Sequence, residues 1–194
     1  MIFADPFGSN TQAPEDGAVA ATTGAPARAP NSRPDRHAER QKAHDYWEKA
    51  ITALAISSET ITMAQASLAN NDTADASRFL EQGQKYAASA RDTAGNERPD
   101  GWDDIGMHLG ESAQEFDDAL GHLRAYMDSN KASDGASALD SNDQAKNDLA
   151  NATHEARERY ISMGGKWSDL DDVETEQKAV DSLVRMMAGS GNGQ

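Results

Sequence analysis

The chain has 194 residues, and its 33 acidic and 18 basic side chains give a formal net charge of −15. This charge argues against a general affinity for nucleic acid or for anionic membrane surfaces. The sequence contains no cysteine, which excludes disulfides, thiolate zinc sites, iron–sulfur clusters and cysteine nucleophiles.

Only 37% of the residues are hydrophobic, and many of these are alanine. Small apolar residues suit close helix–helix packing, and no alternation of β-branched residues indicates a strand. We therefore predict an all-α fold, an up-and-down helical bundle of about five helices with a long first helix and an extended N-terminal arm. Residues 1–34 should form this arm, residues 35–188 the bundle and residues 189–194 a flexible tail.

Residues 1–34 carry five prolines among small and polar residues, so this segment alone should be disordered. Ile2, Phe3 and Phe7 at its tip belong either to an unstructured end or to a short anchor that docks on a neighbouring subunit. The segment lacks the regions of a Sec signal, and no stretch reaches the roughly 20 apolar residues of a membrane span. We expect a soluble protein, cytoplasmic or within a particle.

The first predicted helix runs from about residue 35 to about residue 70. Intervals of four and three between its seam residues hold one narrow face against a partner helix. These residues are Ala43, Trp47, Ala50, Leu54, Ser57, Ile61, Ala64 and Leu68. A second helix over about 73–95 follows so closely that the two must form an antiparallel hairpin. The longer helix leaves the region of Tyr46 and Trp47 either for later helices to cover or for a partner.

Three further helices are predicted. The third, over about 101–130, has a seam of Ile105, Leu109, Ser112, Phe116, Ala119, Leu123 and Tyr126. A polar linker over 131–138 should precede a fourth helix, which opens with the capping box Ser141–Gln144 and closes at Gly164–Gly165. A fifth helix should open at Ser168, with a stripe of Leu170, Val173, Gln177, Val180, Val184 and Met187.

A basic segment, residues 28–42, interrupts the acidic chain. Its cations are Arg28, Arg33, Arg36, Arg40 and Lys42, with His37 beside them. Cations in the first turns of a helix oppose its dipole. Two explanations remain open: a partner, such as nucleic acid or an acidic neighbour, or neutralisation by the protein's own acidic helices. We take Arg33, Arg36 and Arg40, together with Tyr46, Trp47 and the tip of the arm, as hypothetical partner-binding residues.

The sequence offers little chemistry. No histidine lies in a Glu-x-x-His motif of the di-iron bundles. Asp118 with His122, and His108 with Glu111, are interpreted as ordinary surface pairs rather than as metal or acid–base sites. No phosphate loop or nucleophile elbow is present. We therefore predict no catalytic, cofactor-binding or metal-binding residues, no cofactor and no enzymatic activity.

The leading hypothesis is a non-catalytic helical component of a larger particle, such as a phage virion or a secretion apparatus, held by contacts with other protein subunits. One alternative is an acidic inhibitor that mimics DNA. Its candidate surface is the acidic run Asp100, Asp103, Asp104, Glu111, Glu115, Asp117 and Asp118, which otherwise is a solvated face. Another alternative is a secreted effector whose N-terminal segment is an export signal.

Overall fold

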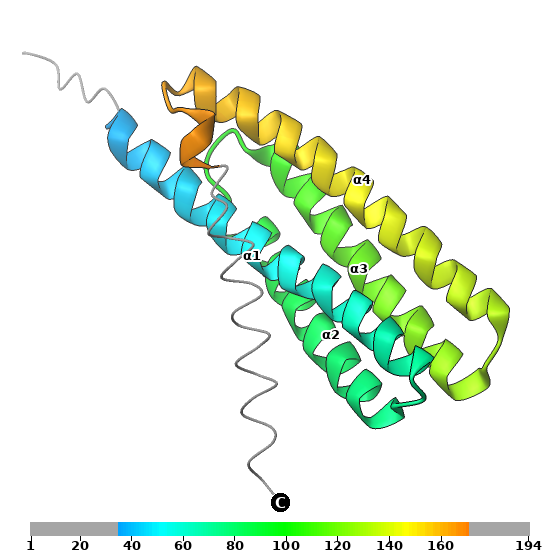
Figure 1. The fold of residues 1–194 in the computed structure, drawn as a ribbon. Helices are drawn as coiled ribbons and strands as arrows, with labels where there is room; N and C mark the ends of the chain where they lie inside the picture. The colour runs from blue at the N-terminus through cyan, green and yellow to red at the C-terminus, as the bar shows by residue number, and fades with distance from the viewer. Residues whose placement is uncertain (1–34, 171–194) are drawn as a thin grey trace, which may run out of the picture. The chain divides into compact units, whose positions relative to one another are not determined.

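The computed structural model describes residues 35–170, and all regular secondary structure in this range is helical (Figure 1). The helices are α1 (Arg36–Ala69), α2 (Thr73–Asn96), α3 (Asp103–Ser129) and α4 (Ala132–Ser162), followed by the short 3-10 helix η1 (Trp167–Asp169). No strand occurs in the described range, which confirms the all-α prediction there. None of these helices is both long and apolar enough to cross a membrane.

The first two helices form the predicted antiparallel hairpin, and their ends agree with the prediction (Figure 1). The Asp35 carboxylate caps α1 by accepting from the His37 amide at 3.1 Å, and Asp72 caps α2 by accepting from the Asp75 amide at 3.0 Å. Asn71 between the helices adopts a left-handed φ of 58°, a conformation that asparagine tolerates. The predicted seam of the first helix is buried, apart from the half-buried Leu68. The α2 helix buries mainly small residues, together with Phe79 and Leu80.

The link between α3 and α4 differs from the prediction. The polar linker over 131–138 and the capping box at Ser141 were wrong, because α4 begins at Ala132 and runs through both. Only Asn130 and Lys131 separate the helices, and Asn130 makes the turn with a φ of 52°. The new first turn is held by the Ser129 hydroxyl, which donates to Asp134 at 2.7 Å.

The end of α4 lies where the sequence predicts, since Gly164 follows it with a φ of +82° that glycine adopts without strain. The predicted fifth helix does not begin at Ser168, because η1 occupies that position and the chain turns there. Leu170 is buried, and the predicted stripe beyond it lies outside the described residues. The predicted arm and tail also lie outside them.

The packing of the four helices is uneven. α3 packs against α2 on one side and along nearly all of α4 on the other, whereas α1 meets α4 at only a few positions. The residues that α4 buries are small or polar except for Tyr160, which limits how tightly α4 is held by apolar contacts. The bundle is therefore open between α1 and α4 in the described part of the chain.

Tyr46 gives a testable consequence of burial. Its ring is 3% exposed, its hydroxyl has no hydrogen-bond partner, and burial raises its pKa from 10.0 to about 12, partly offset by Arg98. As pH rises, the Tyr46 hydroxyl loses its proton in the unfolded chain before it does so in the folded chain. Its contribution to the free energy of unfolding is therefore complete below pH 10 and is lost as pH rises through 12. At about 1.4 kcal/mol per pKa unit, the loss reaches roughly 2 to 3 kcal/mol.

We expect Tyr46→Phe to remove this part of the pH dependence and to leave stability near pH 7 equal or higher, because no hydrogen bond is lost and a buried hydroxyl without a partner is removed. Urea unfolding of both proteins at pH 7, 10 and 12 measures the difference. The comparison cancels the titration of the other tyrosines and lysines. An equal loss in both proteins between pH 10 and 12 would contradict the expectation.

Candidate functional site

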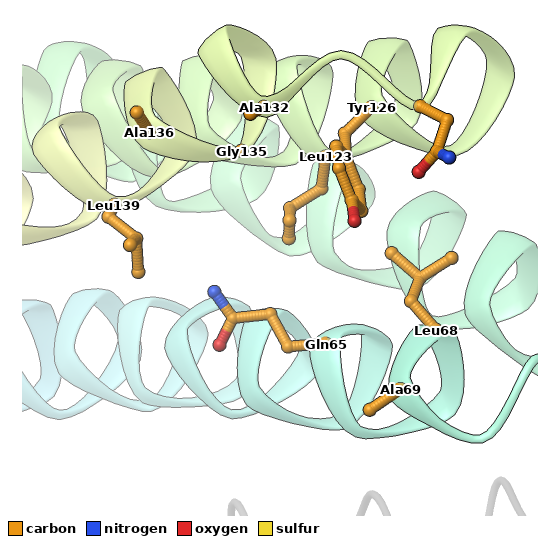
Figure 2. Close-up of a pocket in the computed structure, with 10 residues that line it drawn as sticks. Gln65, Leu68, Ala69, Leu123, Tyr126, Ala132, Gly135, Ala136 and Leu139 are labelled. Atoms are coloured by element: carbon orange, nitrogen blue, oxygen red, sulfur yellow. The ribbon is translucent and has the colours of Figure 1, made fainter.

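The open side of the bundle contains an apolar groove of about 600 Å³ (Figure 2). It lies between the end of α1, the end of α3 and the start of α4. Its principal apolar residues are Leu68, Ala69, Leu123, Tyr126, Ala136 and Leu139. Leu139 is 54% exposed, an unusual position for a leucine in a chain with so few large apolar side chains.

Small residues of α4 create the space for this groove. Ala132, Gly135 and Ala136 form its α4 wall, and a side chain at Gly135 would begin 3.5 Å from the Tyr126 ring. Leu68 enters from α1 and Leu139 from α4, as Figure 2 shows. The two leucines therefore face a shared opening from opposite sides.

The α3 and α4 turns that carry groove residues also contain aspartates, whereas the α1 turns do not. Asp128 lies in the last turns of α3, and Asp134 and Asp140 lie in the first turns of α4. Asp128 and Asp140 are exposed, and Lys131 is the one basic residue between them. None of these three carboxylates is among the residues that line the groove, which are apolar or neutral.

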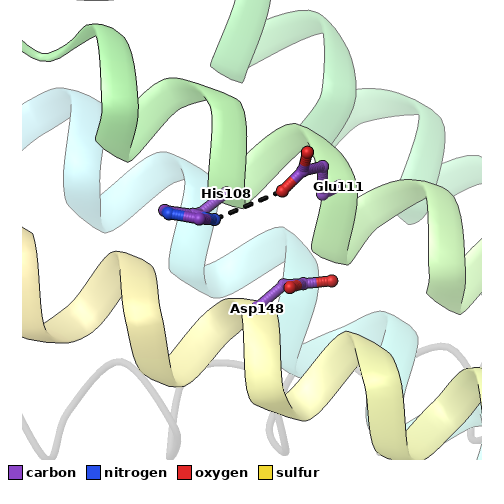
Figure 3. Close-up of side chains that lie close together, drawn as sticks. All are labelled: His108, Glu111 and Asp148. Atoms are coloured by element: carbon purple, nitrogen blue, oxygen red, sulfur yellow. Dashed lines mark hydrogen bonds and ion pairs between the residues drawn. The ribbon is translucent and has the colours of Figure 1, made fainter.

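A second cluster lies on the α3–α4 contact, away from the groove. His108 and Glu111, one turn apart on α3, lie near Asp148 of α4, and Figure 3 shows the three side chains at this contact between the helices. Nδ1 of His108 is 3.2 Å from a Glu111 oxygen, and its Nε2 is 3.6 Å from Oε1 of Glu155. The prediction of an ordinary surface pair missed the two α4 carboxylates.

Arg40 of the basic segment has a partner inside the described part of the chain, and this partner is backbone rather than an acidic side chain. Arg40 donates from Nη1 to the carbonyl oxygens of Met163 at 3.2 Å and Gly164 at 3.4 Å, just beyond the end of α4. A cation is favourable at the C-terminal end of a helix, which compensates Arg40 for its unfavourable position in α1. Arg36 is exposed, and Arg33 lies outside the described residues.

The aromatic candidates are core residues here. Tyr46 is 3% and Trp47 is 4% exposed, so later parts of the chain cover the region that the sequence left open. Trp102 contacts Tyr46 edge-on with ring centres 5.8 Å apart, and Trp167 contacts Trp47 at 6.3 Å. We therefore leave both residues out of the surface proposed below. Ile2, Phe3 and Phe7 lie outside the described residues.

The acidic run on α3 is partly paired. Asp103 forms an ion pair with Arg98 at 3.0 Å, and Asp117 forms one with Arg91 at 3.1 Å. Asp118 accepts a hydrogen bond from Gln114 at 2.9 Å. Arg98 and Arg91 reduce the negative charge that the run presents to a nucleic-acid-binding protein, whereas the neutral Gln114 does not.

No known protein family, curated protein or solved structure matches the chain in comparison. The geometry of the groove and of the α3–α4 cluster is therefore the basis for the functional proposals that follow. The groove supplies an extended apolar surface, and the cluster supplies nitrogen and oxygen donors.

Proposed function

We propose that this chain is a non-catalytic assembly protein that binds an amphipathic helix of another protein subunit in the groove between α1 and α4. The observation that carries this proposal is the exposed apolar groove itself. The proposal keeps the sequence-based hypothesis of a component of a larger particle, in which contacts between subunits hold the chain.

A helix fits this groove better than an extended peptide does. The groove is bordered by two helices and floored by Leu123 and Tyr126 of a third, so the apolar stripe of one more helix would complete the bundle. An extended peptide gains affinity from backbone pairing at a sheet edge, and no strand is present in residues 35–170. Asp128, Asp134 and Asp140 lie in the same turns of α3 and α4 as groove residues, so a helix with basic residues beside its apolar stripe would be favoured over an acidic one.

We predict that Leu139→Asp weakens binding of such a helix at least tenfold, because the new carboxylate lies in the apolar groove. A fluorescein-labelled amphipathic helix of Leu and Lys, titrated with the full chain, measures this by anisotropy. Ile161→Asp is the matched control: it adds the same charge to an equally exposed residue of α4, 49% exposed, outside the groove. Leu139 is exposed, so thermal unfolding should not change.

Three outcomes would contradict the proposal. The first is that Leu139→Asp and Ile161→Asp bind the peptide equally well. The second is that a peptide whose leucines are replaced by glutamine binds as tightly as the Leu and Lys peptide, since charge alone would then explain the affinity. The third is a dimer, measured by light scattering, that Leu139→Asp dissociates, because a second copy of the chain would then occupy the groove.

A further inference from the structure

We propose that His108, Glu111 and Asp148 bind one divalent transition-metal ion, such as Zn²⁺, between α3 and α4, with Glu155 as a positioning residue. This site is separate from the groove and does not depend on the proposed function. It departs from the sequence-based expectation of no metal-binding residues, because that expectation rested on neighbours along a single helix.

The donor atoms already converge. One ligand atom from each of the three residues lies within 4.8 Å of the other two. Around a tetrahedral Zn²⁺ with bonds of 2.0–2.2 Å, ligands lie about 3.4 Å apart. Nδ1 of His108 and the near oxygen of Glu111 are at 3.2 Å without any rearrangement. The Asp148 oxygen lies within 4.8 Å of both, so a movement of up to about 1.4 Å would bring the third donor to the tetrahedral separation.

Asp148 is the residue that ordinary packing explains least. It is 8% exposed, and both of its oxygens accept only from the neutral Gln144 amide, at 3.3 Å each. No cationic side chain forms an ion pair with it in the part of the chain that the structure describes. Burying a carboxylate without a positive partner is unfavourable, and a bound cation would supply that partner.

Glu155 supplies the second feature of a metal-binding histidine. Its Oε1 is 3.6 Å from Nε2 of His108, on the ring nitrogen opposite the Glu111 side, and its Oε2 is buried without a hydrogen-bond partner. Metal-ligating histidines commonly donate their second N–H to a carboxylate, which fixes the ring and the tautomer. This arrangement assigns Nδ1 to the metal and leaves the proton on Nε2.

The donor set indicates the class of ion. One imidazole and two carboxylates suit Zn²⁺ and its first-row neighbours, whereas Mg²⁺ and Ca²⁺ prefer oxygen ligands alone. The ion would join α3 to α4, where α4 buries mainly alanine, Asn142 and Asp148. The proposed site is thus structural: the ion would hold α4, which forms one wall of the groove, against α3.

The test uses the tag-free, metal-free full chain, titrated with ZnCl₂ in a calorimeter. We expect one ion per chain, with Asp148→Asn and His108→Gln each binding at least tenfold more weakly. His154→Gln is the matched control, because His154 and Glu158 form a similar pair at 3.6 Å on the exposed face of α4. That variant should bind as the unmodified chain does, and circular dichroism checks that all variants are folded.

Histidine side-chain ¹⁵N NMR tests the assignment directly. Zn²⁺ should shift Nδ1 of His108, while its Nε2 keeps a proton; Glu155→Gln should weaken binding tenfold or more and alter the Nε2 signal. Absence of Zn²⁺ binding by the unmodified chain would overturn the proposal. Unweakened binding by Asp148→Asn, or an equal loss in His154→Gln, would overturn it as well.

Discussion

Replacing Trp102 by alanine should lower the free energy of unfolding by about 4 kcal/mol, in the range found for large aromatic residues deleted from cores. Trp102 is completely buried in the short connection between α2 and α3. Its ring meets Tyr46 edge-on, a geometry that adds to the gain from burial. Alanine would leave a cavity beside the buried Tyr46 ring.

Urea unfolding followed by circular dichroism measures this loss. Trp167→Ala is the comparison, since Trp167 is half-buried against Trp47 and should cost clearly less. A loss below about 1.5 kcal/mol in Trp102→Ala would contradict the expected role, because that is the upper range for a surface or partly buried contact.

Trp102 and Trp167 also explain why Tyr46 and Trp47, which the sequence suggested as partner-binding residues, are buried in the structure. Helix lengths along the chain indicate that α1 extends beyond α2. They do not reveal that residues in connections, Trp102 and Trp167, fold back over the exposed end. Connections carry no periodic pattern, so a large residue within one gives no signal of the surface that it covers.

The first three helices were predictable because each repeats a seam of apolar residues at intervals of three and four. The start of α4 was not, because its first turns contain Gly135 with serine and aspartate, which are poor helix formers. Packing against α3 outweighs this low helix propensity. Gly135 lies close to the Tyr126 ring, so this turn of α4 contacts α3 although it has no side chain at that position. Treating 131–138 as a linker placed Leu139 outside the helical seam and concealed the groove.

The α3–α4 cluster was only half visible in the sequence. His108 and Glu111 are three residues apart, a spacing common on helix surfaces. Asp148 and Glu155 follow about 40 residues later in the chain, and only the tight turn at Asn130 sets the register that brings them opposite. The difference between a surface pair and a possible metal site therefore depended on the boundary that was predicted wrongly.

Gly83 marks the closest approach of α1, α2 and α3, and we expect Gly83→Val to cost about 3 kcal/mol or more. A Cβ atom there would lie 2.3 Å from Oγ1 of Thr60 and 2.8 Å from both methyl groups of Leu120. Thr60 and Leu120 are completely buried and cannot move aside. Thr60 is held further by donation to the Ser57 carbonyl at 2.7 Å.

Gly121→Val is the control for this prediction, because Gly121 lies in α3 and no neighbouring side chain or helix comes within 4 Å of the position that a Cβ atom would take there. Glycine and valine differ little in helix propensity, so this variant should stay within about 0.5 kcal/mol of the unmodified chain. Urea unfolding of both variants separates the cost of crowding from that of the substitution itself. Similar losses at both positions would show that the three helices do not approach one another at Gly83 as closely as the structure has them. If only Gly83→Val is destabilised, the result supports the close packing of α3 against the α1–α2 hairpin at Gly83. This packing positions α3, which forms the floor of the groove.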